Sequence, residues 1–117
     1  MRLNQRTKWS RFNQELQEKL KDYQFTYEQV WQITGCGYKT LQRYMDRELV
    51  HPIKVNDVWY FTSELLDKVK FIYELRNQAR IPVEFSAALF DYMKSKKVSP
   101  DYQELLKRVP EWALYNQ

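Results

Sequence analysis

The stretch that decides the fold is residues 33–41, which read Ile-Thr-Gly-Cys-Gly-Tyr-Lys-Thr-Leu. It holds Gly35 and Gly37, the only two glycines of the 117-residue chain. Glycine adopts left-handed backbone conformations at little steric cost, so two glycines this close mark a tight turn. Helical patterns flank the turn, over 26–34 before it and over 38–47 after it. We therefore predict a helix-turn-helix, two helices joined by a short glycine-containing turn.

The first of these two helices is predicted to begin at Thr26. The run Thr-Tyr-Glu-Gln over residues 26–29 fits a capping box, in which Thr26 and Gln29 satisfy each other's backbone amides. Gly35 is placed to end the helix. Its apolar side chains are Val30, Trp31 and Ile33.

The second helix, predicted over 38–47, has two chemically different faces. Leu41, Tyr44 and Met45 fall on one side, which we assign to the core. Lys39, Arg43 and Arg47 follow at four-residue steps and line the opposite side, with Gln42 and Asp46 beside them. A helix that enters the major groove of DNA needs this arrangement, because long cations reach phosphate and guanine and an amide reaches adenine.

A short β-hairpin is predicted next. The pair His51-Pro52 stops the helix and favours an extended backbone. Two β-prone runs, 53–55 and 58–61, are separated by Asn56-Asp57, a good two-residue hairpin turn.

The remaining helices follow the apolar spacing. Thr62 or Ser63 caps a long helix that reaches about Gln78, and Pro82 is placed as the first residue of the next helix. We expect a basic linker over 94–97. A last short helix would open at Ser99-Pro100 and end at Pro110.

An amphipathic helix is also predicted near the N-terminus, over 9–22. Its stripe is Trp9, Phe12, Leu16, Leu20 and Tyr23. The predicted fold class is mainly α, a winged helix-turn-helix with one short β-hairpin and a helical extension at each end. We expect one folded unit with three parts, an arm and helix over 1–24, a central domain over 25–93, and a linker and short helix over 94–117.

The central part, 25–93, resembles the MerR-type winged helix. The resemblance rests on the turn at 33–41, on Tyr44, on the Leu-Val-His-Pro run at 49–52, and on the aromatic run at 59–62. It also rests on residues 71–76. The resemblance implies a DNA-binding regulator that dimerises through a long C-terminal helix. Here Pro110 cuts that segment short, so we expect a monomer, or a homodimer that does not use the usual long coiled coil.

Charge is concentrated in the first half of the chain. Residues 1–47 have a net charge of +4, residues 48–93 of −2 and residues 94–117 of +2, which gives +4 in total. A basic first half suits an anionic partner, and double-stranded DNA is the partner that we expect. The predicted DNA-contacting residues are Lys39, Thr40, Gln42, Arg43, Arg47, Lys54, Arg6 and Arg11.

Two other functions remain open. The first is a protein-interaction module that has kept the fold without DNA binding, since some similar MerR-like proteins modulate a J-domain co-chaperone. The net charge of −2 over 48–93 favours this alternative. So does the predicted hairpin over 53–61, the wing of the fold, because it has a single lysine. The second is an excisionase-like protein that bends DNA, which also uses a short winged helix.

Composition argues against an enzyme. Two glycines are too few for a dinucleotide-binding fingerprint or a phosphate-binding loop. One cysteine, Cys36, and one histidine, His51, leave no cysteine-cluster zinc site and no visible catalytic partners. No apolar run approaches the ~20 residues that a membrane helix needs. We therefore expect no cofactor, no metal, no membrane partner and a cytoplasmic location.

Overall fold

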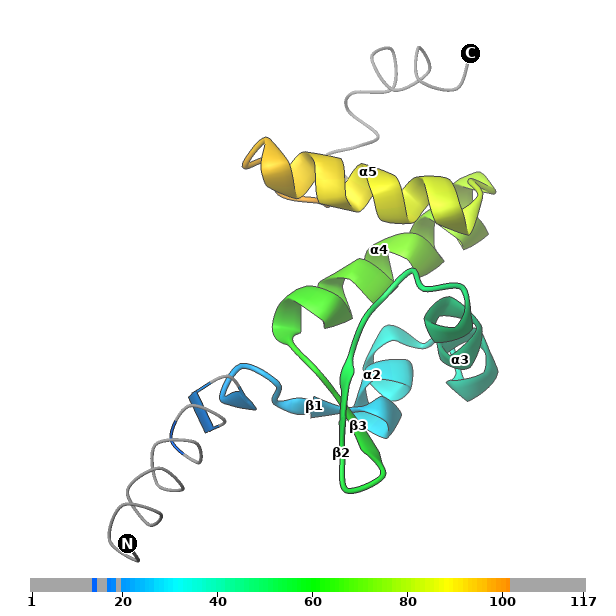
Figure 1. Ribbon diagram of the computed structural model, residues 1–117. Helices are drawn as coiled ribbons and strands as arrows, with labels where there is room; N and C mark the ends of the chain where they lie inside the picture. The colour runs from blue at the N-terminus through cyan, green and yellow to red at the C-terminus, as the bar shows by residue number, and fades with distance from the viewer. Residues whose placement is uncertain (1–13, 15–16, 19, 102–117) are drawn as a thin grey trace, which may run out of the picture.

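The computed structural model describes residue 14, residues 17–18 and residues 20–101. The helix predicted over 9–22 falls largely outside these residues, and the helix predicted between Pro100 and Pro110 falls almost wholly outside them. Figure 1 shows the elements in chain order. They are β1 (Phe25–Thr26), α2 (Tyr27–Thr34), α3 (Tyr38–Asp46), β2 (Ile53–Val55), β3 (Val58–Phe61), α4 (Ser63–Ala79) and α5 (Val83–Ser95). The mainly α fold and the winged helix-turn-helix of the predicted fold class are confirmed.

The capping box at the start of α2 is present. The backbone amide of Gln29 donates to Oγ1 of Thr26 at 3.2 Å, and the backbone amide of Thr26 donates to Oε1 of Gln29 at 2.9 Å. The helix ends at Gly35, which takes a left-handed conformation with φ 76°. Both ends of α2 are therefore fixed by the residues that the sequence indicated.

The hairpin forms as predicted and gains a third strand. Asn56 and Asp57 both have positive φ, 50° and 64°, as a two-residue type I′ turn requires. The sheet order is β1-β3-β2, with both pairings antiparallel. In this register Phe25 lies opposite Phe61. We did not predict β1, because its two residues carry no pattern and are ordered by a partner strand far along the chain.

The two long helices differ slightly from the prediction. Thr62 caps α4, since its Oγ1 accepts from the backbone amide of Leu65 at 3.0 Å. Pro82 is the N-cap of α5 and not its first helical residue. The last turn of α5 takes in Lys94 and Ser95, so the segment outside the helix is shorter than the predicted linker over 94–97.

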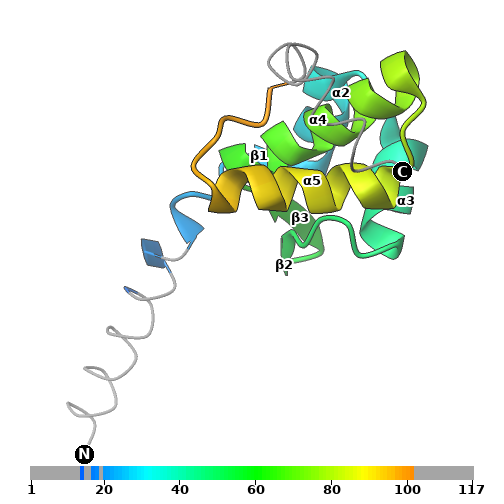
Figure 2. The same ribbon diagram turned by 90° about the horizontal axis from the view of Figure 1, so that it is seen from above.

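The core lies in two clusters, and α4 contributes residues to both. The larger cluster joins the helix-turn-helix and the sheet to α4, and includes the fully buried Val30, Leu41, Phe61, Val69 and Ile72. The smaller cluster lies between α4 and α5, where the rings of Phe71 and Phe90 meet edge to face at 5.7 Å. Figures 1 and 2 show α5 lying across α4, on the side away from the sheet. The helix α4 therefore supports both the helix-turn-helix and α5.

Candidate nucleic-acid interface

The turn between α2 and α3 is held by its own backbone and by Thr34. The amide of Gly37 donates to the carbonyl of Trp31 at 3.5 Å, and Oγ1 of Thr34 donates to the carbonyl of Val30 at 2.7 Å. Gly37 has φ 85° and ψ 160°, which only glycine adopts readily. These contacts set where α3 begins.

Cys36 points inward from this turn. Its side chain is buried, and its Sγ lies 3.4 Å from the carbonyl oxygen of Gly37 and 3.3 Å from Oγ1 of Thr34. Burial raises the pKa of the Cys36 thiol, and its side-chain hydrogen bond with Thr34 opposes this shift. The thiol therefore stays protonated at neutral pH and helps to pack the turn.

The helix α3 separates core and surface as the sequence predicted. Leu41 and Tyr44 are buried against the larger core cluster. Desolvation on burial raises the pKa of Tyr44 to about 12, so its hydroxyl is neutral at physiological pH. On the other side the four candidate side chains with the longest reach are exposed, namely Lys39, Gln42, Arg43 and Arg47.

Two details of α3 differ from a freely solvated helix. Nε2 of Gln42 donates to Oδ1 of Asp46 at 2.9 Å, one turn along the helix. Arg47 is the C-cap of α3 and lies just beyond its last helical residue, whereas the sequence prediction placed it inside the helix. Thr40 is half-buried.

Apolar side chains are exposed at both ends of the turn. Ile33, in the last turn of α2, is 59% exposed, and Tyr38, the first residue of α3, is 56% exposed. The Tyr38 ring lies edge to face with Trp31 at 6.4 Å, and Nζ of Lys39 lies 6.0 Å from the centre of the Tyr38 ring.

The fold brings a further arginine to the arginines of α3. A surface hollow of about 500 Å³ lies where α3, α4 and the start of α5 meet. Its lining residues are Thr40, Arg43, Tyr44, Arg47, Tyr73, Arg76, Asn77, Pro82, Val83 and Glu84. We did not single out Arg76 from the sequence, because it is far along the chain from α3 and belongs to no motif. The hollow is rich in cations and contains one acid, Glu84.

That acid is paired. Nη1 of Arg47 lies 3.2 Å from Oε1 of Glu84, which joins the end of α3 to the first turn of α5.

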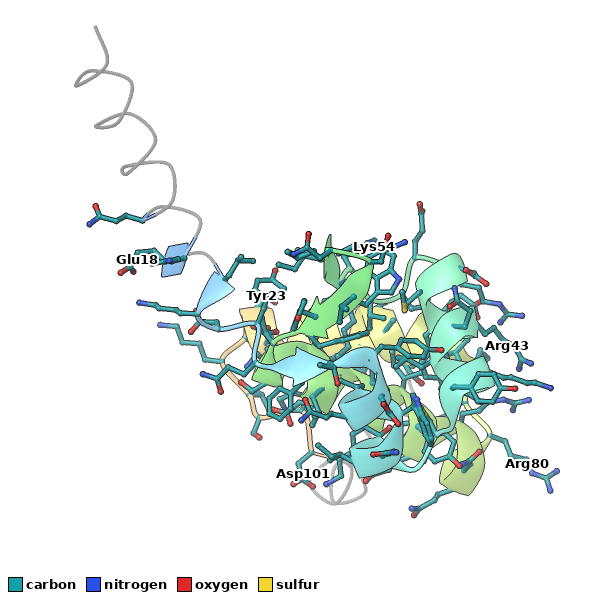
Figure 3. The ribbon with its side chains drawn as sticks, turned by 90° about the horizontal axis from the view of Figure 1, so that it is seen from below. Glu18, Tyr23, Arg43, Lys54, Arg80 and Asp101 are labelled. Atoms are coloured by element: carbon teal, nitrogen blue, oxygen red, sulfur yellow. The ribbon has the colours of Figure 1, made fainter. Side chains whose placement is uncertain are left out.

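Figure 3 shows Arg43 and Arg80 extending from the same side of the molecule, with Lys54 on the wing. Arg80 ends α4 in a left-handed conformation with φ 55° and was not among the predicted contacts.

The wing carries one cation on its strands, Lys54. It lies opposite Trp59 in the pairing of β2 with β3, and its Nζ is 5.5 Å from the centre of the Trp59 ring. The cation therefore rests on an aromatic face, while its side chain stays exposed. Asp57 adds a negative charge at the hairpin turn.

Two predicted contacts, Arg6 and Arg11, lie outside the described residues. Among residues 14, 17–18 and 20–101, no group of three His, Cys, Asp or Glu side chains is arranged to hold a metal ion. In that same part of the chain, no helix combines the length and the apolar character that crossing a membrane would require.

The central part of the chain matches a known protein family. The model of the MerR helix-turn-helix family of regulatory proteins matches residues 25–91, which is more than half of the chain. Neither a curated protein nor a solved structure gives a match. The matched residues start at β1 and reach into α5, so they contain the whole helix-turn-helix, the wing and the arginine-lined hollow. The chain therefore belongs to the MerR family of helix-turn-helix regulatory proteins, a family of DNA-binding transcription regulators.

Proposed function

We propose that this protein is a small transcription regulator that reads the major groove of double-stranded DNA with α3. One observation carries the proposal. The exposed side of α3 presents Lys39, Gln42 and Arg43, while Leu41 and Tyr44 anchor the other side in the core. A helix held in this way can enter the groove without disturbing its own packing.

Each candidate side chain of α3 has a role that suits its chemistry. Arg43 and Lys39 are long donors that fit the O6 and N7 acceptors of guanine. The Gln42 amide fits adenine, and its hydrogen bond to Asp46 orients it before DNA arrives. Thr40 has a hydroxyl that can donate to a phosphate.

Other cations would position the protein on the duplex. Arg47 and Arg76 line the hollow beside α3, where a phosphate of the DNA backbone would meet both guanidinium groups. Lys54 would contact phosphate from the wing. Arg6 and Arg11 would contact further phosphates of the DNA backbone as parts of an N-terminal arm. A protein with this function acts where DNA is, which agrees with the cytoplasmic location expected from sequence.

A second candidate is the protein-interaction module. The observation that favours it is the exposure of Ile33 and Tyr38, two large apolar side chains at the helix-turn-helix turn. A wing with one lysine and Asp57 at its tip also offers little to DNA. A modulator of a J-domain co-chaperone is one form of this candidate.

The deciding experiment begins with selection of duplexes from a random-sequence pool, at low salt, with the full chain. Binding of the selected duplex and of a random duplex is then titrated at two salt concentrations. The variant Lys39→Ala/Arg43→Ala should lose most of its preference for the selected duplex. The control Lys70→Ala/Lys94→Ala removes the same charge from residues that line a separate hollow beside α4 and α5, and should keep the preference.

If the wild type selects no sequence, base reading by α3 is wrong, whatever the salt dependence of its binding to random duplex. Retention of a protein partner that depends on Ile33 and Tyr38 would then favour the interaction module.

A further inference from the structure

The hollow beside α3 holds an ion pair between residues that are far apart in the chain. Nη1 of Arg47 and Oε1 of Glu84 are 3.2 Å apart, and their side chains are 51% and 61% exposed. Glu84 is the one acid among the residues that line the hollow, against three arginines, Arg43, Arg47 and Arg76. One carboxylate therefore lies among cations that would otherwise face solvent or DNA.

A carboxylate and a phosphate compete for the same donors. Both present oxygen atoms that guanidinium groups bind through charged hydrogen bonds, so one arginine nitrogen cannot fully serve both. Because the pair is exposed to water, it is weak enough to exchange for a DNA contact.

We propose that Glu84 acts as an internal competitor of the DNA phosphate: it holds Arg47 across the hollow and so lowers the affinity of the protein for any duplex. This inference rests on the proposed DNA-binding function. Contacts to phosphate carry no sequence information, so Glu84 weakens non-specific binding as much as specific binding. The contacts of Lys39, Gln42 and Arg43 with bases then decide on which DNA sequence the protein stays bound.

Two other roles for Glu84 make different predictions. If Glu84 instead positioned Arg47 for its DNA contact, removing the carboxylate would weaken binding. If Glu84 only stabilised the start of α5 through its charge near the helix N-terminus, removing it would change stability slightly and leave affinity as it was.

The experiment compares full-length wild type with Glu84→Gln, Arg47→Ala and the double variant. Glu74→Gln is the matched control, because Glu74 is also an acid near a cation, 4.0 Å from Lys70, and lies outside this hollow. Dissociation constants are measured for a random duplex and for the selected duplex at low and high salt. Elution from a heparin column gives a second readout on a polyanion, and urea unfolding checks that every variant is folded.

We expect Glu84→Gln to bind both duplexes about two- to fivefold more tightly at low salt, the range of an exposed ion pair. It should elute from heparin at higher salt, while Glu74→Gln matches wild type. In the Arg47→Ala background the gain from Glu84→Gln should disappear, because Arg47 is the residue that Glu84 withholds.

Weaker or unchanged binding by Glu84→Gln overturns the proposal, and so does a gain that persists without Arg47 or that Glu74→Gln reproduces. The parent function fails separately. If Glu84→Gln equals wild type while Lys39→Ala/Arg43→Ala still loses sequence preference, only the role of Glu84 is wrong. If wild type and every variant bind no duplex, DNA binding is wrong, and the role of Glu84 with it.

Discussion

The hydroxyl group of Tyr27, the first residue of α2, donates a hydrogen bond to the backbone carbonyl of Tyr38, the first residue of α3. The two residues are the starting points of the two helices of the helix-turn-helix. This bond therefore ties the start of α2 to the start of α3.

Removing this hydroxyl should loosen the angle between the helices. We expect Tyr27→Phe to lower the free energy of unfolding by about 1 kcal/mol, the usual net value of such a hydrogen bond. Affinity for a selected duplex should fall more than affinity for a random one, because only base contacts need the exact placement of α3. Urea unfolding and duplex titration measure the two effects. Tyr60→Phe removes the same group from the sheet, and an equal loss of preference in that variant would contradict the role of Tyr27.

The two glycines of the turn should differ in how well they tolerate a side chain. A Cβ added at either position meets no atom within 4 Å, so any cost comes from the backbone alone. Gly35, at φ 76° and ψ 5°, is in the left-handed helical region, and Gly35→Ala should cost about 1–2 kcal/mol. Gly37, at φ 85° and ψ 160°, is in a region that is essentially restricted to glycine, and Gly37→Ala should cost more, about 2–3 kcal/mol.

Urea unfolding of both variants tests this order. Equal losses would show that the turn relaxes around the new side chain at residue 37. Gly35→Asn serves as the control, because asparagine accepts the left-handed conformation better than alanine does.

Stability should fall at high pH because of Tyr44. Desolvation holds the pKa of Tyr44 at about 12 in the folded protein, whereas in the unfolded chain it returns to its ordinary value of 10.0. The folded state thus favours the neutral phenol, so this contribution is complete below pH 10 and is lost as the pH rises from 10 to 12. Two pKa units correspond to roughly 2–3 kcal/mol.

The measurement is the free energy of unfolding of wild type and Tyr44→Phe between pH 8 and 12. The variant lacks the titrating group, so it should lose less stability than wild type across this range. Parallel curves would show that Tyr44 ionises as easily in the folded protein as in the unfolded chain.

If α3 reads bases as we propose, α3 and the N-terminal arm should behave differently toward DNA. Arg43→Ala should cost about 1–3 kcal/mol of binding to a selected duplex and relax preference at one position. Arg6→Ala should weaken binding to all sequences alike and reduce the salt dependence by about one unit of slope. Titration of each variant against selected and random duplexes at two salt concentrations separates them. The same salt dependence and the same uniform weakening in both variants would assign Arg43 to phosphate.

Local chemistry explains why parts of this fold could be predicted. The capping box at Thr26, the glycine turn and the Asn56-Asp57 hairpin each depend on residues that are close in the chain. The spacing of Leu41 and Tyr44 against Lys39 and Arg43 also separated core from surface correctly.

What escaped prediction depends on distant partners. The strand β1 exists because Phe25 and Thr26 pair with Phe61 and Tyr60, and two residues alone carry no strand pattern. Arg76 and Glu84 reach the arginines of α3 only through the packing of α4 and α5, which no local spacing reveals. The end of α5 was placed too early because it has no glycine or proline stop, and the chain turns instead at Lys97, with φ 57°.

Thr26 belongs to two structures at once, since it pairs with Tyr60 in the sheet and caps α2 with its side chain. Detaching β1 from β3 therefore also removes the cap of α2. The two losses form one cooperative opening and not two successive fraying steps. Native-state hydrogen exchange can follow this opening at two amides. The amide of Gln29 reports the cap of α2, and the amide of Leu65 reports the cap of α4, which follows β3 directly. Equal protection of the two amides would show that both caps open together. Because Tyr27, the residue after Thr26, also holds the carbonyl of Tyr38, we expect such an opening to free the start of α3 as well.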